Sequence, residues 1–227
     1  LIIRSIFKMP SKNLVKLSAA GSGKTWGICS DALSIVNDAA NKKKVLITTY
    51  TNKGVEAINR EIKKQNFGVL SERIFIRSWY QFLLHDLIRP YQSFVAGINK
   101  IKSFDFSNMY GEINYFAKGK SLRYINPQGN VLANHASELA IYLNSQSNGM
   151  VVERLEKIYS HIFIDEIQDM AGNDLELIEL LMDSAIIITC VGDNKQATFK
   201  THNTQKRKKY AGKNIWFFFN YLESKGK

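Results

Sequence analysis

One short segment limits the possible folds of this chain more than any other. Residues 18–25 read Ser-Ala-Ala-Gly-Ser-Gly-Lys-Thr and lie between an apolar run at 14–17, which predicts a short buried strand, and a helical pattern over about 25–40. Small residues at such a junction let backbone N–H groups surround a phosphate chain, and the helix N-terminus adds its positive dipole end. The alternative is a glycine-rich turn that binds nothing, and the strand–loop–helix order argues against it.

The same segment assigns roles to particular side chains. Lys24 is expected to reach the β- and γ-phosphates of a nucleotide, and the Thr25 hydroxyl is expected to ligate Mg²⁺. The strict pattern opens with glycine, whereas this one opens with Ser18, at its least demanding position. The predicted binding set is Ala20, Gly21, Ser22, Gly23, Lys24 and Thr25.

An acidic strand end supplies the second half of the expected site. Residues 162–169 read Ile-Phe-Ile-Asp-Glu-Ile-Gln-Asp, so a hydrophobic strand delivers two adjacent carboxylates to the carboxyl edge of a sheet. Asp165 is placed to hold Mg²⁺, and Glu166 is the expected general base for the water that attacks the γ-phosphate. A strand that runs into an acidic surface turn is the alternative, which the upstream phosphate loop disfavours.

Apolar runs alternate with helical patterns along the chain, which predicts an α/β fold with a mostly parallel sheet flanked by helices. Between 89 and 151 this alternation weakens, and Asn, Ser, Gly and Lys become frequent around scattered aromatics such as Phe104 and Phe106. We interpret this stretch as an inserted, mainly helical subdomain with a small core of its own rather than as a linker. Residues 1–88 and 152–227 then form the main domain.

Composition narrows the partners. A net charge of +11 and a pI near 9.5 favour a polyanion, most simply nucleic acid, although an anionic membrane surface or a basic surface without a partner fits charge alone. No apolar run approaches the length of a membrane span, so no membrane partner is predicted. The two cysteines lack zinc or disulfide spacing, which favours a reducing, cytoplasmic compartment.

The chain ends carry less information. Residues 1–16 contain basic residues and no acid, which fits a weak transit peptide less well than a surface lead-in to the first strand. Because the sequence begins with Leu1 rather than Met, we expect a fragment, a processed product or an incomplete record. The aromatic stretch 216–221 is typical either of a truncated interface helix or of a docked terminal helix.

Four motifs occur in an order that resembles one family. Asp-Glu-Ile-Gln-Asp at 165–169 resembles motif II of the UvrD/Rep type of superfamily-one helicase, and Ala-Gly-Ser-Gly-Lys-Thr at 20–25 resembles motif I. Thr-Tyr-Thr-Asn-Lys at 49–53 is similar to motif Ia, and Val-Gly-Asp-Asn-Lys-Gln at 191–196 is similar to motif III. Together the motifs span most of the chain.

The resemblance implies a RecA-like P-loop NTPase domain that uses ATP and Mg²⁺ in an ATP-dependent DNA helicase. It implies catalytic roles for Lys24, Glu166 and Gln196, the last as a sensor of the γ-phosphate. It implies movement on single-stranded DNA, or at a junction of single and double strands, with 3′ to 5′ polarity suggested. The implied DNA contacts are Thr49, Thr51 and Asn52 in motif Ia, with Ser78 and Trp79 in a weaker match; core packing is the alternative for Trp79.

Three departures qualify that picture. No glutamine that would read adenine precedes the phosphate loop, so adenine specificity stays open. After motif III, Phe199 is followed by Lys200, and Arg207 comes later than the family arginine. The second RecA-like motor domain is absent, and we expect a second chain or a missing C-terminal region to supply it.

An ATP-gated nucleic-acid-binding module without turnover is the main alternative, and another P-loop enzyme, such as a small-molecule kinase, ranks last. Pathway and oligomeric state stay open.

Overall fold

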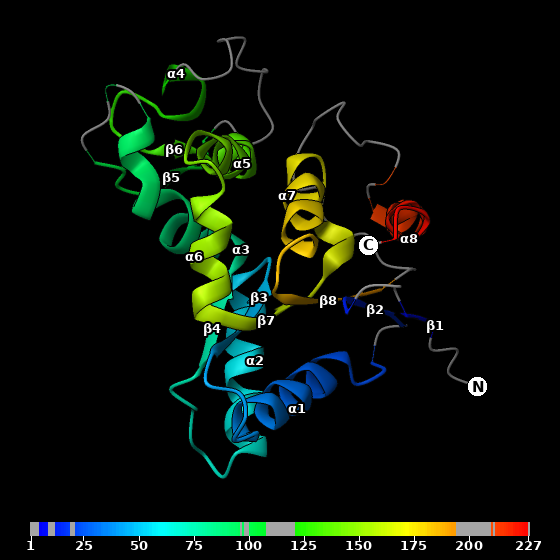
Figure 1. Cartoon of the computed structure of the whole chain (residues 1–227). Helices are drawn as coiled ribbons and strands as arrows, with labels where there is room; N and C mark the ends of the chain where they lie inside the picture. Colours follow the sequence, from blue (N-terminus) through cyan, green and yellow to red (C-terminus); the bar gives the residue numbers. More distant parts are fainter. Residues whose placement is uncertain are drawn as a thin grey trace.

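A computed structural model describes residues 5–8, 12–18, 21–95, 97, 100–107, 121–193, 210 and 212–226. Within them a six-stranded sheet has the order β1-β2-β8-β7-β3-β4 (Figure 1). Its strands are β1 (Ser5–Lys8), β2 (Leu14–Leu17), β3 (Lys44–Thr49), β4 (Ile74–Ser78), β7 (Tyr159–Ile164) and β8 (Ile187–Gly192). All neighbouring pairs are parallel except β1 with β2. The mostly parallel sheet is therefore confirmed, and β1 is an antiparallel edge strand within the segment expected to be a lead-in.

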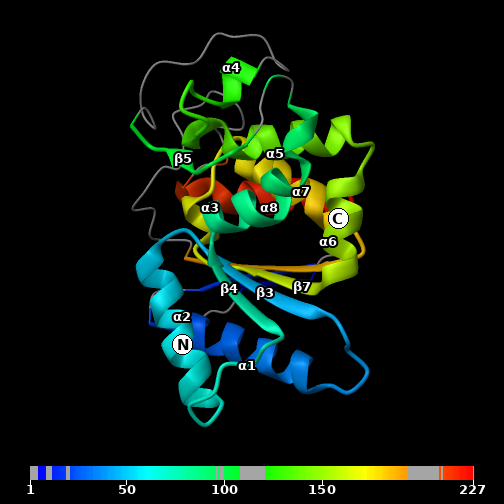
Figure 2. The same ribbon diagram turned by 90° about the vertical axis from the view of Figure 1, so that its left-hand side faces the viewer.

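Helices cover both faces of this sheet (Figure 2). On one face lie α1 (Lys24–Asn37) and α2 (Asn52–Gln65). On the other lie α3 (Trp79–Phe82), α5 (Ala136–Gln146), α6 (Met150–Ile158), α7 (Asn173–Met182) and α8 (Ile215–Ser224). Alternation along β3 serves both layers, because Val45 and Ile47 pack in the cluster under α1 and α2 while Leu46 packs in the opposite cluster. Strands buried on both faces appear in sequence as continuous apolar runs, which is why they were recognisable.

Local signals fix where the helices after β3 and β4 begin. Thr51 caps α2, since its hydroxyl accepts a hydrogen bond from the Gly54 N–H at 3.0 Å. Ser78 and Gln81 form a reciprocal capping box at the start of α3. The chain then continues through a π-helical segment, η1 (Leu83–Ile88), and a 3₁₀ segment, η2 (Arg89–Phe94). Both helices thus begin at the carboxyl edge of the sheet.

The described part of the 89–151 stretch packs on the main domain. It contains β5 (Phe104–Asp105), α4 (Ser121–Tyr124), β6 (Val131–Leu132), η3 (Ala133–His135) and α5. Its buried side chains, among them Tyr91, Val131 and Leu139, belong to the same contiguous cluster as Ile162 and Ile164 of the central sheet. The described residues therefore share one core with the sheet instead of forming the separate small core that we expected. The domain boundaries themselves stay a prediction.

The aromatic stretch near the C-terminus forms a docked helix. After a short turn, η6 (Gly212–Asn214), helix α8 buries Ile215, Phe218, Phe219 and Leu222 in the main cluster. Trp216 and Phe217, on its outer side, are 38% and 45% exposed. No helix among the described residues is long and apolar enough to cross a membrane.

Candidate functional site

Three strand ends bring the predicted phosphate loop and the acidic segment together. The loop follows β2, the acids follow β7, and β8 lies between these two strands in the sheet. The Ser18 N–H donates to the Gly192 carbonyl at 3.0 Å, which holds the start of the loop against the end of β8. The Asp165 N–H donates to the Thr48 carbonyl at 2.8 Å, so the acidic segment is held by β3 on its other side. Residues far apart in sequence therefore meet at one edge.

The loop backbone has the conformation that an anion site requires. Gly21 and Gly23 have positive φ values of 73° and 79°, and a Cβ on either would meet nothing within 4 Å. These glycines are required for their left-handed backbone rather than for space. Gly23 is the N-cap of α1, whose first turn has neither a side-chain cap nor an acidic residue. A first turn of this kind suits an anion, which the positive end of the helix dipole favours.

Lys24 lies between the loop and the end of β8. Its ammonium donates to the Ser18 carbonyl at 3.2 Å and lies 3.8 Å from the nearer Asp193 carboxylate oxygen. Asp193 is 3% exposed, so this pair sits largely out of water. We did not predict Asp193 as a site residue, although it stands in the motif III segment. Ala20 and Gln196 lie outside the described residues, and their roles stay predictions.

The two acids differ in burial, since Asp165 is buried and Glu166 is partly exposed. Asp165 is 5% exposed, and burial, helped by the neighbouring Glu166 charge, raises its pKa to about 7, although the Glu166 N–H and Lys24 act the other way. The Glu166 N–H donates to an Asp165 carboxylate oxygen at 3.0 Å. Glu166 itself has φ 55°, an uncommon left-handed backbone for a residue with a side chain. Such a backbone is a feature of functional turns, where surrounding contacts enforce it.

Gln168 joins the acidic segment to the end of β8. Its amide N–H donates to a Glu166 carboxylate oxygen at 2.5 Å, and its carbonyl oxygen accepts from the Asp193 N–H at 2.9 Å. A Cβ on Gly192 would lie 2.5 Å from that carbonyl oxygen, so only glycine leaves room for the link. Sequence reasoning missed this role of Gln168. Its place in motif II was the available signal.

The donor set fits a nucleotide with Mg²⁺. A carboxylate at Asp165 and a hydroxyl at Thr25 are the hard oxygen ligands that Mg²⁺ prefers, and Lys24 and the loop N–H groups suit phosphate oxygens. Among the described residues, no group of three or more His, Cys, Asp or Glu side chains could hold a metal alone. Mg²⁺ in such a site takes further ligands from substrate phosphates and water.

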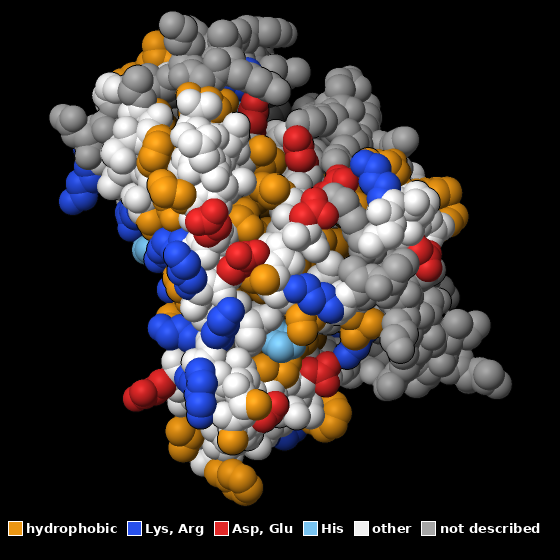
Figure 3. Space-filling view, viewed as in Figure 1, with side chains coloured by type: hydrophobic (Ala, Val, Ile, Leu, Met, Phe, Trp, Pro, Cys, Tyr) orange, Lys and Arg blue, Asp and Glu red, His pale blue; other side chains and the backbone are white. Residues whose placement is uncertain are grey.

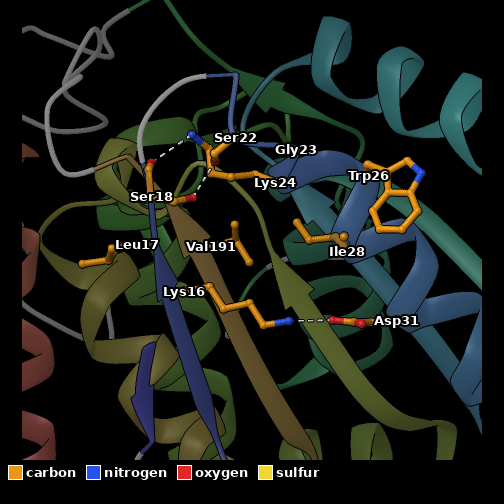
Figure 4. A pocket seen from close by; sticks show the side chains of 11 residues that line it. Lys16, Leu17, Ser18, Ser22, Gly23, Lys24, Trp26, Ile28, Asp31 and Val191 are labelled. Atoms are coloured by element: carbon orange, nitrogen blue, oxygen red, sulfur yellow. Dashed lines mark hydrogen bonds and ion pairs between the residues drawn. The ribbon is translucent and has the colours of Figure 1, made fainter. Parts of the chain in front are cut away.

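A cavity of about 330 Å³ adjoins the loop (Figure 4). It lies between α1 and the strands β2 and β8, and its lining includes Ser22, Gly23, Lys24 and Trp26. The Lys16 ammonium and the Asp31 carboxylate, 2.6 Å apart, close its far end from the phosphate loop. The cavity therefore continues from the phosphate loop along α1.

Comparison with known proteins gives the family. A model of the UvrD/REP helicase N-terminal domain matches residues 3–87 and 84–206. The chain belongs to this family. Its fold is accordingly the α/β fold of a RecA-like P-loop NTPase domain, as the sequence predicted. The chain is also similar to "Gabija protein GajB" of Bacillus cereus (strain VD045), with 27% identity over 192 residues. That match covers 82% of this chain and 38% of the relative's length.

The DNA contacts implied by UvrD/REP membership are only partly accessible. Thr51 and Asn52 are exposed at the start of α2. Thr49 and Ser78, by contrast, are 1% and 6% exposed, and Trp79 is 0% exposed with its indole N–H donating to an Asp174 carboxylate oxygen at 3.0 Å. These three side chains are buried in the structure, with Ser78 capping α3, and their contact with DNA stays a prediction. For Trp79, the burial is what its core-packing alternative describes.

Four aromatic side chains that we did not predict as site residues gather beside these buried ones. The Tyr80 ring lies 5.8 Å from the Tyr50 ring, 5.1 Å from the Phe104 ring and 4.9 Å from the Phe106 ring, measured between centroids. Phe106 is 51% exposed, and the other three are partly buried. We call Tyr50, Tyr80, Phe104 and Phe106 the aromatic cluster. It joins the ends of β3 and β4 to the 89–151 stretch, where Phe104 and Phe106 stood out as aromatics.

Cationic side chains occupy a different part of the surface. On the face shown in Figure 3, Lys and Arg side chains gather along the side of the molecule where α6 and β4 lie. Lys43 donates to the Glu156 carbonyl at 2.7 Å, and the Lys44 ammonium lies 4.3 Å from the Phe75 ring centroid. Part of the positive charge of the protein therefore lies along this side of the face shown.

Proposed function

We propose that this chain is the ATP-binding and ATP-hydrolysing domain of a DNA helicase, and that it couples hydrolysis to movement on single-stranded DNA. One observation carries the proposal: the phosphate loop, Lys24, the two acids and Asp193 lie together at a single edge of the sheet. Gln168 links the segment after β7 to the segment after β8. Membership of the UvrD/REP helicase family also supports a helicase function.

Each residue of this edge has a proposed part in hydrolysis. When bound, ATP would supply the phosphoryl group and Mg²⁺ would neutralise part of its charge. The loop N–H groups and Lys24 hold the phosphates, whereas Asp165 and Thr25 serve the metal. Glu166 accepts the proton of the attacking water, and Gln168 orients its carboxylate through the 2.5 Å hydrogen bond. Lys24 must leave Asp193 for the phosphates when nucleotide enters.

Two surfaces support DNA as the partner. The aromatic cluster offers the ring faces on which bases stack, and that contact tolerates any sequence. Thr51 and Asn52 at the N-terminus of α2 are exposed beside it, where backbone N–H groups favour phosphates. We propose that single-stranded DNA, alone or at a junction with duplex, crosses this region.

The proposed organisation follows the family. Residues 1–88 and 152–227 form the ATP-binding domain, and residues 89–151 are inserted in it. The match covers 38% of the length of the GajB relative, and we propose that a second motor domain, from another chain or from a longer protein, completes the motor. Closure of two such domains on ATP is what would turn hydrolysis into steps.

The test is ATP hydrolysis measured with and without single-stranded DNA, in the wild type and in Glu166→Gln. We expect DNA to stimulate turnover, and the substitution to lower kcat by about 10²- to 10⁴-fold while nucleotide binding persists, because general bases contribute that much. Glu223→Gln, at an exposed position on α8, is the matched control and should hydrolyse normally. Normal turnover in Glu166→Gln would remove Glu166 as the base. Binding without any turnover in the wild type would favour an ATP-gated nucleic-acid-binding module.

A further inference from the structure

The outer face of α2 is predominantly basic. Its exposed charged side chains are four cations and one acid: Lys53, Glu56, Arg60, Lys63 and Lys64. Lys53, Arg60 and Lys64 lie within about 40° of one another around the helix axis, and their positions along it are about 10 Å and 6 Å apart. The helix buries Ile58 and Ile62 on its opposite side. We call Lys53, Arg60 and Lys64 the basic stripe.

The charges of the basic stripe are not neutralised within the described part of the chain. No carboxylate there lies within ion-pair distance of any of the three side chains. A straight row of long cationic side chains is suited to the phosphates of a nucleic acid strand, which carry one charge each at a regular spacing. The outer face of α2 is therefore complementary in charge to such a strand.

The turn that ends α2 holds a phenylalanine ring in water. Phe67 is 98% exposed and has a φ of 51°. The turn is closed by hydrogen bonds, since the Gly68 N–H donates to the Lys63 carbonyl at 2.7 Å and the Asn66 amide donates to the Val69 carbonyl at 3.0 Å. Glycine is usual at the left-handed position of such a turn, because a large side chain strains that backbone. Packing does not account for Phe67 either, whereas contact with a ligand does.

The end of α2 is a fixed support for this ring. The Gln65 side-chain amide, in the last turn of α2, donates to the Trp26 carbonyl of α1 at 3.1 Å and to a Glu61 carboxylate oxygen at 2.8 Å. Figure 1 and Figure 2 both show the turn after α2 at the periphery of the molecule, below the sheet. The opposite end of α2, with Thr51 and Asn52, lies in the region where we propose that DNA crosses. The basic stripe and Phe67 therefore continue from that region.

We propose that the basic stripe and Phe67 form a second contact for single-stranded DNA, in which the phosphates follow the stripe and one base stacks on the Phe67 ring. The inference rests on the proposed function for its DNA partner and adds a segment to the path. The ring favours a single strand, because bases inside a duplex are already stacked on one another. Since α2 is about 21 Å long, a strand with a rise of about 3.4 Å per phosphate passes it with about six nucleotides.

Binding of a labelled oligothymidylate of about 20 nucleotides, longer than α2 spans, tests the role of the ring. Phe67→Ala should weaken binding by about 5- to 150-fold, which is the contribution of one stacked base. Phe67→Gly should weaken it equally without lowering stability, because glycine adopts this backbone without strain. Phe217→Ala removes another exposed phenylalanine, on α8, and should leave the affinity unchanged.

The salt dependence of the same binding tests the basic stripe. Arg60→Ala and Lys64→Ala should each lower the slope of log K against log salt concentration by about 0.7, because each removes one phosphate contact from a single strand. Lys157→Ala removes an exposed cation of α6, on the other face of the sheet, and should leave the slope unchanged. Equal slopes in the wild type, Arg60→Ala and Lys64→Ala would overturn the stripe as a DNA contact.

The outcomes separate this inference from the proposed function. If Phe106→Ala weakens binding and both Phe67 variants leave it unchanged, DNA crosses the aromatic cluster but does not reach the end of α2, and only this inference is overturned. If the wild type binds no oligothymidylate, the proposed DNA partner is overturned with it. Binding to phosphatidylserine vesicles that Phe67→Ala abolishes, with DNA affinity unchanged, would assign the ring to a membrane surface instead.

Discussion

Two stretches of one sheet edge use their motif residues in different ways. At the ends of β2, β7 and β8, the residues that the motifs single out lie close together. They comprise the backbone of the phosphate loop and acids with little exposure, such as Asp165 and Asp193. At the ends of β3 and β4, the motif residues Thr49, Ser78 and Trp79 are buried, and the neighbouring side chains Tyr50 and Tyr80 reach the surface region instead. Tyr50 directly follows Thr49 and Tyr80 directly follows Trp79, so a difference of one position separates a buried side chain from a partly exposed one.

The difference matches what each stretch is proposed to bind. A phosphate chain with a metal has one geometry, and fixed groups out of water recognise it best. Bases of single-stranded DNA pass in any sequence, so exposed ring faces suit them better than buried polar groups. The first stretch is therefore expected to be sensitive to protonation and the second to lost ring area.

The largest expected effect tests the burial of charge at the first stretch. Raising the pKa of Asp165 from 3.8 to about 7 means that the folded protein holds this proton more tightly than the unfolded chain. The stability from that proton is complete below pH 4 and is lost as pH rises through 7. Asp165→Asn should therefore stabilise the metal-free protein at pH 8, by at most roughly 4 kcal/mol, and change little at pH 4. Chemical denaturation at both pH values measures this.

Glu72→Gln is the control, since Glu72 is exposed in the turn before β4. It should leave the stability at pH 8 within experimental error. Equal stability of Asp165→Asn and the wild type at pH 8 would show that Asp165 is solvated. The first stretch would then not differ from the second by having a buried carboxyl group.

A smaller effect distinguishes the exposed aromatic side chains at the second stretch from the buried ones. Phe106→Ala should weaken single-stranded DNA binding by about 1–3 kcal/mol, as expected for one lost stacking contact, and lower stability little because the ring is 51% exposed. Trp79→Phe should do the reverse, since it strips Asp174 of an indole donor in the core. Fluorescence anisotropy with labelled DNA and denaturant melts read the two effects. Loss of DNA binding in Trp79→Phe but not in Phe106→Ala would mean that Trp79, and not Phe106, contacts DNA.

The smallest expected effect concerns Thr51, which is both cap and exposed motif residue. Thr51→Ala should cost about 1 kcal/mol of stability because the Gly54 N–H loses its acceptor, whereas Thr51→Ser should keep the cap. If DNA affinity falls in Thr51→Ala and persists in Thr51→Ser, the hydroxyl is what matters. If it falls equally in both, the methyl group contacts DNA directly.

Local structure was predictable where consecutive residues determine it. The phosphate loop, the acidic strand end and the buried strands are local patterns, and each fixes its own backbone or burial. Sequence reasoning failed where distant segments decide the outcome. Asp174 gives the Trp79 indole a partner in the core, and Phe106 reaches Tyr80 from the 89–151 stretch. Gln168 acquires its role only because β8 ends beside it, and no periodicity records that neighbour.

The shared core has a mechanical consequence. Asp174 of α7 accepts hydrogen bonds from Trp79, just after β4, and from Ser137 of α5, and the apolar cluster runs on through all of these helices. A load applied at the ends of β3 and β4 is therefore transmitted into the sheet through packed side chains and not through a hinge. Removal of the described residues between 89 and 151 would expose apolar side chains of the sheet core, so this stretch cannot be replaced without rebuilding that core.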